Sequence, residues 1–262
     1  MHGINEFAYH FRGQDNFVQK NHAHNEIEII HVVKGTGHML KNGVLYEMRD
    51  NMLFFIDARI PHSVNPKETE HYVRNKIVIA ADAFFSICDT LGVRKEAEAC
   101  LLAPPVYLMH PDSTEQCDAI FARCLDCFQT NERKGLIWGS ILEMLTMYDD
   151  YPKKKSTHNG IVETIIECVN ELAFDNFSLE RLCRKINVSK YYACHIFKKY
   201  VGMTIYEYVL SKKIAESKLL LTETDEPIYA IADKMGFNTS SAYVRFFKKE
   251  VGITPLQFRN NH

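Results

Sequence analysis

The sequence lacks the features that would place the protein in a membrane or outside the cell. It has no run of about 18 consecutive apolar residues, so we expect no membrane-spanning helix. Its first residues, MHGINEFAYHFRGQDNF, lack a basic start followed by an apolar core. We therefore expect no secretory signal and a cytoplasmic protein. A chain of this length without such a signal is not expected to depend on a disulfide framework, although it has eight cysteines.

The cysteines also lack the spacing of a complete zinc site. Cys124 and Cys127 have half of a zinc-ribbon spacing, with Cys117 upstream, but no second pair follows. Most of the eight fall within apolar helical patterns. We interpret them as reduced and mostly buried thiols.

Charge is distributed unevenly along the chain, although the net charge is only −2. Residues 153–262 hold 17 Lys and Arg against 12 Asp and Glu, whereas residues 1–152 hold 14 against 21. An acidic first part and a basic second part predict two domains, at 1–152 and 161–262, with the basic domain facing a polyanion. Residues 153–160 between them are polar and basic, which is typical of a linker.

The first part begins with strands and ends with helices. Short β-type runs occur at 26–33, 52–56 and 74–80, and Lys41-Asn42-Gly43 has the pattern of a hairpin turn. This spacing predicts a small barrel or sandwich. Apolar residues then recur every three to four positions at 113–131 and 135–150, which predicts a helical hairpin. That hairpin either covers the barrel or forms a dimer interface.

The second part contains an internal repeat. FKKYVGMT at 197–204 matches FKKEVGIT at 247–254, an offset of 50 residues. Each copy predicts a helix, a tight turn and a second helix, with a small residue (Cys183 or Ala232) where the two helices cross. The caps that we expect are N-caps at Ser178, Ser189 and Thr239, Pro227 in a first helical turn, and a left-handed Gly236. These are two helix-turn-helix units, and the apolar pattern over Thr204–Leu221 predicts one long helix that joins them.

The second helix of each unit has a buried face and an outward face. Ala193, Ile196, Phe197, Tyr200 and Val201 form the apolar stripe of the first, and Tyr243, Phe246, Phe247 and Val251 that of the second. The outward residues are the candidate DNA contacts: Lys190, Tyr191, Cys194, His195, Lys198, Ser240, Ser241, Val244, Arg245 and Lys248.

These outward residues differ in what they can bind on DNA. Arg245 can form two hydrogen bonds with guanine, the two serines can bond to several bases, and Val244 can contact a thymine methyl. Lys198 and Lys248, with their neighbours Lys199 and Lys249, lie further along each helix and suit phosphates. A solvated helix face without function is the simpler reading of any single one of these residues.

Residues 161–259 resemble the DNA-binding domain of the AraC family of transcription regulators. The matching residues are Lys213-Ile214-x2-Ser217-x-Leu219-Leu220, Ile228-x2-Ile231-Ala232-x3-Gly236-Phe237, Tyr243-x-Arg245-x-Phe247-Lys248-Lys249-x2-Gly252-x-Thr254-Pro255 and Phe258-Arg259. Cys183 stands where the family usually has alanine, and Cys194 and His195 give the first recognition helix an uncommon surface. The resemblance implies a sequence-specific regulator, more often an activator than a repressor, that works with RNA polymerase.

The first part resembles the cupin-like sensor barrel that such regulators commonly carry. His22-x-His24-x3-Glu28-x6-Gly35 is similar to the first cupin motif, and Asp50-Asn51-x5-Asp57-x4-His62 is similar to the second. Asn51 and Arg59 replace the usual glycines, and Asp57 replaces proline. The resemblance implies a homodimer that responds to a small polar effector, such as a sugar.

Four residues of these motifs form the candidate sensor site: His22, His24, Glu28 and His62. Three imidazoles and a carboxylate suit a divalent metal. The same residues also suit the polar lining of an effector pocket, as in regulators of this family that need no cofactor.

The sequence therefore predicts an α+β protein, with a cupin-like N-terminal β-barrel and helical hairpin followed by an all-α domain with two helix-turn-helix units. Its predicted function is ligand-responsive binding to a double-stranded DNA operator. The alternative is a metal-binding cupin enzyme fused to a DNA-binding module. An enzyme has no need of a duplicated helix-turn-helix, so we expect no enzymatic activity.

Overall fold

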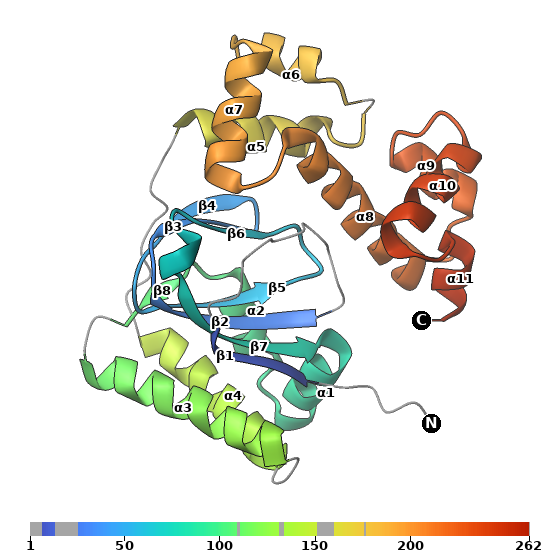
Figure 1. The fold of residues 1–262 in the computed structure, drawn as a ribbon. Helices are drawn as coiled ribbons and strands as arrows, with labels where there is room; N and C mark the ends of the chain where they lie inside the picture. Colours follow the sequence, from blue (N-terminus) through green and yellow to red (C-terminus); the bar gives the residue numbers. More distant parts are fainter. Residues whose placement is uncertain are drawn as a thin grey trace. The chain divides into compact units, whose positions relative to one another are not determined.

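The computed structural model describes residues 7–13, 26–108, 111–130, 134–150, 160–175 and 177–261. It separates into two compact units, which are treated one at a time below. The first unit contains the described residues before Gly160 other than 60–63, and the second contains residues 60–63 and those from Gly160 onward. The first is built from strands and helices and the second from helices alone (Figure 1). The predicted α+β class is confirmed, and the predicted linker lies almost entirely outside the described residues.

The strands of the first unit form two antiparallel sheets. One has the order β1-β7-β2-β5-β8 and the other the order β4-β3-β6. The strands are β1 Phe7–Gly13, β2 Glu26–Lys34, β3 Gly37–Lys41, β4 Val44–Met48, β5 Met52–Asp57, β6 Ser63–Pro66, β7 Val73–Ala80 and β8 Val106–Tyr107, and a short 3-10 helix spans Thr69–His71. In the part of the chain that is described, the two sheets are not joined into one closed barrel. Of the two predicted alternatives, a barrel or a sandwich, the structure is closer to a sandwich.

Strand β2 lies in the middle of the five-stranded sheet and is buried on both faces. Ile27 and Ile29 belong to a core beneath the helices, whereas Ile30 and Val32 belong to a second core between the two sheets. Side chains alternate between the faces of a strand, so the run EIEIIHVV contributes to both cores at once. This double burial explains why apolar residues are nearly continuous in β2.

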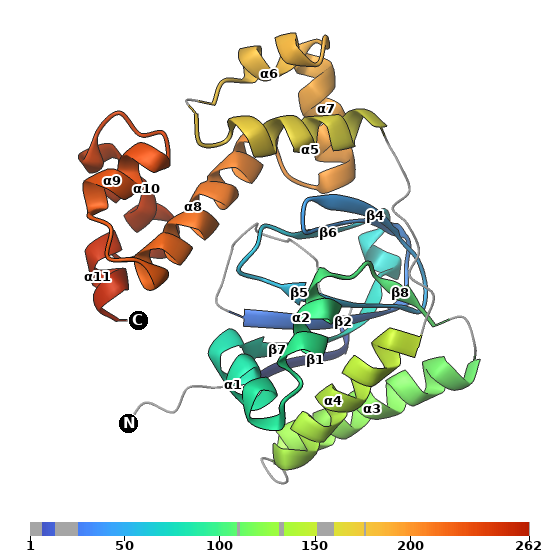
Figure 2. The same ribbon diagram turned by 180° about the vertical axis from the view of Figure 1, so that it is seen from behind.

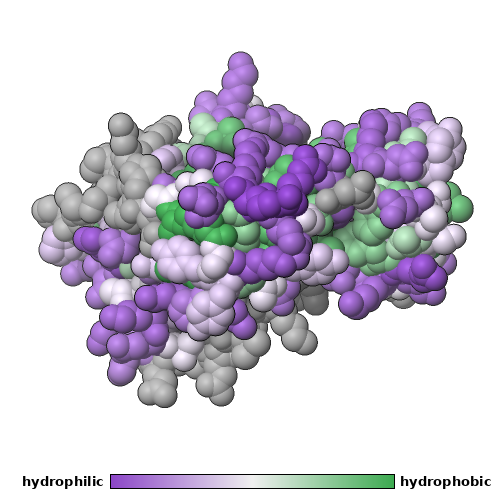
Figure 3. All heavy atoms as spheres, turned by 90° about the horizontal axis from the view of Figure 1, so that it is seen from above, coloured by the Kyte–Doolittle hydropathy of each residue, from purple (hydrophilic) through white to green (hydrophobic). Residues whose placement is uncertain are grey.

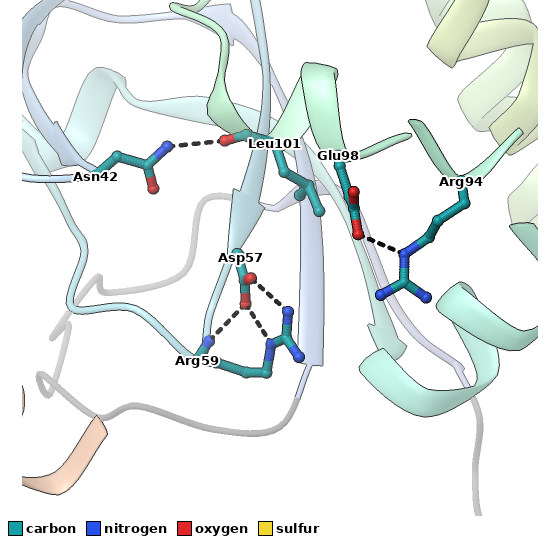
Figure 4. Close-up of polar contacts among 6 residues, drawn as sticks. All are labelled: Asn42, Asp57, Arg59, Arg94, Glu98 and Leu101. Atoms are coloured by element: carbon teal, nitrogen blue, oxygen red, sulfur yellow. Dashed lines mark hydrogen bonds and ion pairs between the residues drawn. The ribbon is translucent and has the colours of Figure 1, made fainter. Parts of the chain in front are cut away.

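The β3–β4 hairpin forms where the sequence predicts it. Asn42 and Gly43 have φ angles of 51° and 73°, the left-handed backbone that a two-residue type I′ turn requires. Leu40 pairs with Leu45 across the hairpin. Figure 4 shows the Asn42 amide directed at the Leu101 carbonyl oxygen, which accepts a hydrogen bond of 2.8 Å. The turn residue therefore also fixes the hairpin to the helix that ends there.

Four helices complete the described part of the first unit: α1 Ala81–Leu91, α2 Arg94–Leu102, α3 Pro111–Thr130 and α4 Lys134–Asp150. The predicted helical hairpin is α3 with α4, which lie side by side along the five-stranded sheet in both views (Figures 1 and 2). Phe121 of α3 and Tyr148 of α4 share one core with Ile29 and Phe55 of the sheet. The hairpin therefore covers this face of the sheet, which is the first of the two roles expected for it.

A buried polar cluster links α3 to the same face of the sheet. His31 and Asn75 pair across β2 and β7, and the Asn75 amide donates a hydrogen bond of 3.1 Å to Asp118 on α3. His31 Nδ1 lies 3.4 Å from the same Asp118 oxygen, and His31 is fully buried. These contacts fix the position of α3 along the strands more specifically than apolar packing alone.

The second unit contains seven helices in its described part: α5 Gly160–Leu172, α6 Leu179–Lys185, α7 Lys190–Val201, α8 Ile205–Glu223, α9 Ile228–Lys234, α10 Ser240–Val251 and α11 Pro255–Asn260. The long helix predicted between the two helix-turn-helix units is α8. Its N-cap is a reciprocal capping box, in which Thr204 and Glu207 satisfy each other's backbone N–H groups. The matching residues of the repeat, Thr254 and Gln257, form a second capping box at α11.

All eight cysteines are free, and only Cys194 is more than slightly exposed. Cys117, Cys124 and Cys127 lie on the buried face of α3, and burial raises the pKa of Cys124 to about 11. A thiol with a raised pKa stays protonated and is a poor metal ligand. The interpretation of the cysteines as reduced, packed side chains is confirmed.

Hydrophilic residues cover much of the face drawn in Figure 3, with smaller hydrophobic patches between them. No helix in the described ranges is long and apolar enough to span a bilayer.

Candidate nucleic-acid interface

Each helix-turn-helix unit is held by the same backbone arrangement at its turn. Asn187 and Gly236 have φ angles of 54° and 71°. The next residue in each turn donates to the small residue of the preceding helix, Val188 to Cys183 at 3.1 Å and Phe237 to Ala232 at 3.0 Å. These six-residue closures end α6 and α9 and direct the chain into the recognition helix. The predicted left-handed Gly236 is confirmed, and Asn187 takes the same role in the first unit.

The N-terminal ends of the recognition helices α7 and α10 are capped as the sequence predicts. Ser189 accepts a hydrogen bond from the Tyr192 amide, and Thr239 accepts one from the Ala242 amide. Ser178 caps α6 in the same way. Pro227 occupies the N-cap position of α9 and not its first turn, since its ψ angle of 148° is extended.

The predicted apolar stripes anchor both recognition helices. Ala193, Phe197 and Val201 of α7 and Tyr243 and Phe247 of α10 are buried. Ile196, Tyr200, Phe246 and Val251, also expected on these stripes, are half-buried. With one face fixed against the fold, the opposite face of each helix is presented outward.

The candidate DNA contacts lie on these outward faces, with three half-buried exceptions. Exposed are Lys190, Tyr191, His195, Lys198, Ser241, Arg245 and Lys248. Half-buried are Cys194, Ser240 and Val244. Val244 packs against the core of the second helix-turn-helix unit, so only part of it is accessible. The structure therefore groups seven of the ten predicted residues on two exposed helix faces.

The basic residues are arranged in the same way in both units. Lys198 and Lys199 lie in the last turn of α7, and Lys248 and Lys249 lie in the last turn of α10. Cations at this end of a helix are stabilised by its dipole. Because they are exposed and recur in both copies, they suit phosphate contacts, which are not specific for sequence.

Two interactions on the first recognition helix were not predicted from the sequence. Tyr191 and His195 stack, with ring centroids 6.0 Å apart and an interplanar angle of 9°. The Lys190 ammonium donates to the Glu180 carboxylate of α6, and this hydrogen bond lowers the pKa of Glu180. The i, i+4 spacing of the two rings is visible in the sequence, whereas the contact with Glu180 depends on how α6 and α7 cross.

The second unit also has a structural anchor that sequence reasoning missed. The Arg259 guanidinium donates to the Glu226 carbonyl at 2.6 Å and to the Leu221 carbonyl at 3.3 Å. Leu221 lies near the end of α8, and Glu226 lies just before α9. Arg259 thus holds the connection by which the second recognition helix is positioned.

The four candidate sensor residues are only partly described. His22 and His24 lie outside the described residues. Glu28 is buried on β2, and its carboxylate accepts a hydrogen bond of 2.5 Å from Lys76 on β7. Lys76 pairs directly with Ile30, so both charged side chains are on the face of the sheet that borders the core between the two sheets. His62, in the segment between β5 and β6, places Nδ1 3.0 Å from the Ile60 carbonyl oxygen.

Sequence reasoning missed Lys76, the basic partner of Glu28, and its neighbour Arg74. Arg74 and Lys76 lie two residues apart in β7, on either side of Asn75, and this spacing places both basic side chains on one face of the strand. The Arg74 guanidinium lies 5.7 Å from the centre of the Tyr72 ring. Burial raises the pKa of Tyr72 to about 12, so its phenol stays protonated. Together these residues form a polar region within an otherwise apolar core.

The two cupin-like motifs meet at a backbone contact. The Asp50 carboxylate accepts a hydrogen bond of 2.6 Å from the Gly35 amide, which joins the turn after β2 to the turn before β5. Asn51, in place of the usual glycine, has a φ angle of 59°, and asparagine tolerates that conformation well. Arg59, in place of the other glycine, folds back on Asp57 with hydrogen bonds of 2.8 and 2.9 Å (Figure 4). The second motif therefore keeps its turn at Asn51, and its two other substituted residues, Asp57 and Arg59, pair with each other.

The described residues contain no group of three or more His, Cys, Asp or Glu arranged to hold a metal. The predicted metal set is not tested by this, because two of its four members are outside the described ranges. Glu28 is nevertheless a poor fit for a metal ligand, since its carboxylate already pairs with the Lys76 ammonium.

Comparison with known proteins gives a matching family profile for each of the two units. Residues 4–138 match the family profile described as an AraC-like ligand binding domain, and residues 182–261 match a helix-turn-helix domain profile. The HTH-type transcriptional regulator YtdP of Bacillus subtilis is 32% identical over 102 residues, which are 39% of this chain and 13% of YtdP. The regulatory protein SoxS of Salmonella typhimurium is 26% identical over 104 residues, which are 40% of this chain and 97% of SoxS.

Among solved structures, the C-terminal domain of the response regulator YesN from Fusobacterium nucleatum is similar. It is 36% identical and covers 37% of this chain and 95% of that domain, with a TM-score of 0.36. The two profiles and the curated relatives are those of regulators, not of enzymes, and the second unit contains a helix-turn-helix DNA-binding domain. Because the two profiles lie in the order sensor then helix-turn-helix, and the first alone covers more than half of the chain, the protein belongs to the AraC family of transcriptional regulators.

Proposed function

We propose that the protein is a ligand-responsive transcription activator that works as a homodimer in the cytoplasm and contacts RNA polymerase at its promoters. Residues 1–152 bind the effector and form the dimer, residues 153–160 are the linker, and residues 161–262 bind operator DNA. The observation that carries the proposal is the pairing of two exposed recognition helices with a sensor-like unit that buries a charged pair between its sheets.

The effector is a small polar metabolite, such as a sugar, bound at the polar region around Glu28. The Glu28–Lys76 pair supplies both acceptors and donors at one place, and this suits a ligand with several hydroxyl groups. His22, His24 and His62 complete the pocket in this proposal. No cofactor is required, and Lys76 takes the place that a divalent metal would occupy beside Glu28.

A thermal-shift screen of small metabolites tests this proposal directly. A ligand that binds only the folded state raises the melting temperature, by an amount equivalent to about 2.7 kcal/mol at 100 times its dissociation constant. We expect the shift to persist with a chelator present and to disappear in Lys76→Met. The matched control is Lys95→Met, at an exposed position of α2, which keeps the shift. A shift that vanishes with chelator would instead support the metal-binding alternative.

Effector and operator are expected to affect each other's binding. A signal passes between domains only if the effector has different affinities for the two arrangements of the protein. Linkage then requires that operator DNA changes effector affinity by the same factor as effector changes operator affinity. Calorimetry with and without operator measures that factor. If the factor is one while transcription still responds, control lies in the contact with polymerase.

The dimer interface in this proposal is the α3–α4 hairpin. Phe128 of α3 and Leu136 of α4 are about half-exposed, although the opposite faces of both helices are buried against the sheet. Exposed apolar side chains on neighbouring helices suit a symmetric contact. Sedimentation of the full chain tests this, since Leu136→Glu should give monomers and Leu102→Glu, at an exposed leucine of α2, should not. Dimers in both variants would move the interface elsewhere.

A further inference from the structure

The two recognition helices present different chemistry at equivalent positions. The 50-residue offset of the repeat aligns Tyr191 with Ser241 and His195 with Arg245. Both helices begin at a capped N-terminus and end in a lysine pair, so the backbone and the phosphate contacts are alike. The two copies therefore differ in the side chains that meet the base edges.

On α7 these side chains form a flat aromatic surface. Tyr191 is 81% exposed and stacks on His195, so the two rings lie in nearly parallel planes along the outer face of the helix. Residues four apart on a helix are neighbours, and the stack restricts both side chains before DNA is bound. Less conformational entropy is then lost on binding. The surface is preorganised, and it presents aromatic ring faces with the Tyr191 hydroxyl and the His195 nitrogens at their edges.

The positive charge of Lys190 at the start of α7 is also partly neutralised by an ion pair. The Lys190 ammonium, one residue before Tyr191, donates to the Glu180 carboxylate. On α10 the corresponding region contains Ser240 and Ser241, and Arg245 extends a guanidinium into solvent. Guanidinium groups select guanine, whose major-groove edge offers two acceptors. Stacked phenol and imidazole rings lack the two parallel N–H donors with which a guanidinium binds both guanine acceptors.

We infer that the stacked Tyr191–His195 pair reads thymine through its C5-methyl group, so that one subunit recognises two unlike elements, one containing thymine and one containing guanine. The thymine C5-methyl is the only methyl group on the major-groove edges of the four bases. Contact with the aromatic pair removes it from water, and a cytosine or purine at that position offers no such group. The inference rests on the DNA-binding role of α7 and α10 and specifies what each helix selects.

Selection of preferred duplexes from a randomised library by the full chain is the first experiment. We expect enriched sequences with two unlike elements. Tyr191→Ala should lose the thymine preference in one element, and Arg245→Ala should lose the guanine preference in the other. Tyr229→Ala is the matched control, because Tyr229 is an exposed tyrosine of α9, outside the recognition helices, and it should keep both preferences.

Deoxyuridine substitution is the second experiment, since it removes only the methyl group. Replacing the selected thymine by deoxyuridine should weaken binding of the wild-type protein by about fourfold, the value of one buried apolar carbon. Tyr191→Phe should retain that sensitivity and Tyr191→Ala should lose it. Deoxyuridine in the guanine-containing element should have no effect on either protein.

Three results would overturn the inference, and they are distinguishable. If no sequence is enriched, sequence-specific DNA binding itself fails and the inference fails with it. If two elements are enriched but Tyr191→Ala remains as sensitive to deoxyuridine as the wild type, only the role of the aromatic pair is wrong. If Tyr191→Ala changes transcription without changing DNA affinity or selectivity, the aromatic surface binds a protein and not thymine.

Discussion

The first unit buries charged side chains, whereas the two recognition helices of the second unit expose them. Glu28 and Lys41 are almost fully buried and have partners within the fold. Arg245 and Lys248 extend into solvent from α10. A buried charge that loses its partner is costly, whereas an exposed charge is already solvated. Substitutions in the first group should therefore change stability, and substitutions in the second should change DNA binding with little effect on stability.

The largest effect is expected at the Glu28–Lys76 pair. Glu28→Gln leaves the Lys76 ammonium without its carboxylate and should lower the free energy of unfolding by about 3 kcal/mol. Urea denaturation followed by the fluorescence of Trp138 measures this in the first unit alone, because it is the single tryptophan and packs against the core under the sheet. The control is Glu47→Gln, an exposed acid of β4, which should change stability by less than about 0.5 kcal/mol. If both variants lost the same free energy of unfolding, the expectation that a buried charge pair contributes more to stability than an exposed one would be wrong.

The next effect is a pH dependence that originates at Lys41. Its ammonium donates to the carbonyls of Cys100, at 3.3 Å, and Ala103, at 2.5 Å, at the end of α2, and burial lowers its pKa from 10.5 to about 7. Between these values the unfolded chain binds the proton more strongly than the folded chain, so stability should rise as pH increases from 7 to 9. The slope should not exceed about 1.4 kcal/mol per pH unit.

Two lysine variants test whether that slope belongs to Lys41. Lys41→Met should remove most of it, and Lys95→Met, which changes an exposed lysine, should leave it intact. Denaturation at several pH values, again followed at Trp138, gives the slopes. A wild-type stability that is constant from pH 7 to 9 would contradict the expected protonation.

A smaller effect, on binding instead of folding, is expected on α10. Arg245→Ala should cost about 1–3 kcal/mol of operator affinity and relax specificity at one base position. Lys248→Ala should weaken binding to all sequences alike and reduce the salt dependence by about one counterion. Gel-shift titrations on operator and scrambled duplexes at two salt concentrations separate these outcomes. Identical behaviour of the two variants would refute the division into base and phosphate contacts.

The smallest effect is expected from the exposed pair of Glu180 and Lys190. Glu180→Gln frees the lysine for phosphates and should strengthen binding to scrambled duplexes slightly, by no more than a few fold. Folding should be unaffected, because exposed pairs add little stability. Glu171→Gln, which frees Lys185 of α6 in the same way but away from the recognition helix, is the control. Weaker binding in Glu180→Gln would show that the pair positions α7 instead of competing with DNA.

Periodicity and local turn chemistry made much of this structure predictable from the sequence. The caps at Ser189 and Thr239, the left-handed Gly236 and the Asn42-Gly43 turn depend on short-range stereochemistry, so neighbouring residues determine them. The outward faces of α7 and α10 follow from helical spacing in the same way. What makes these features predictable is that each depends on residues within one or two turns.

Contacts between distant segments were not predictable in the same way. Lys76 reaches Glu28 across 48 residues because β7 and β2 pair, and nothing in either strand alone indicates that register. Arg259 binds carbonyls at the end of α8, and Asp118 meets Asn75, for the same kind of reason. The separation into two sheets likewise depends on which strands pair, and alternation of residues predicts strands without predicting their partners.

The continuity of α8 has a consequence for how target sites can diverge. Its 19 residues form one helix, so each inserted or deleted residue would turn the second recognition helix by about 100° and shift it by about 1.5 Å relative to the first. If one subunit reads two elements, as inferred above, these must keep a nearly constant separation and phase at every target site. For the proposed dimer, target sites can vary instead in the base sequence of each element and in the distance between the sites of two subunits, and these would be the features that grade the response of a set of target genes.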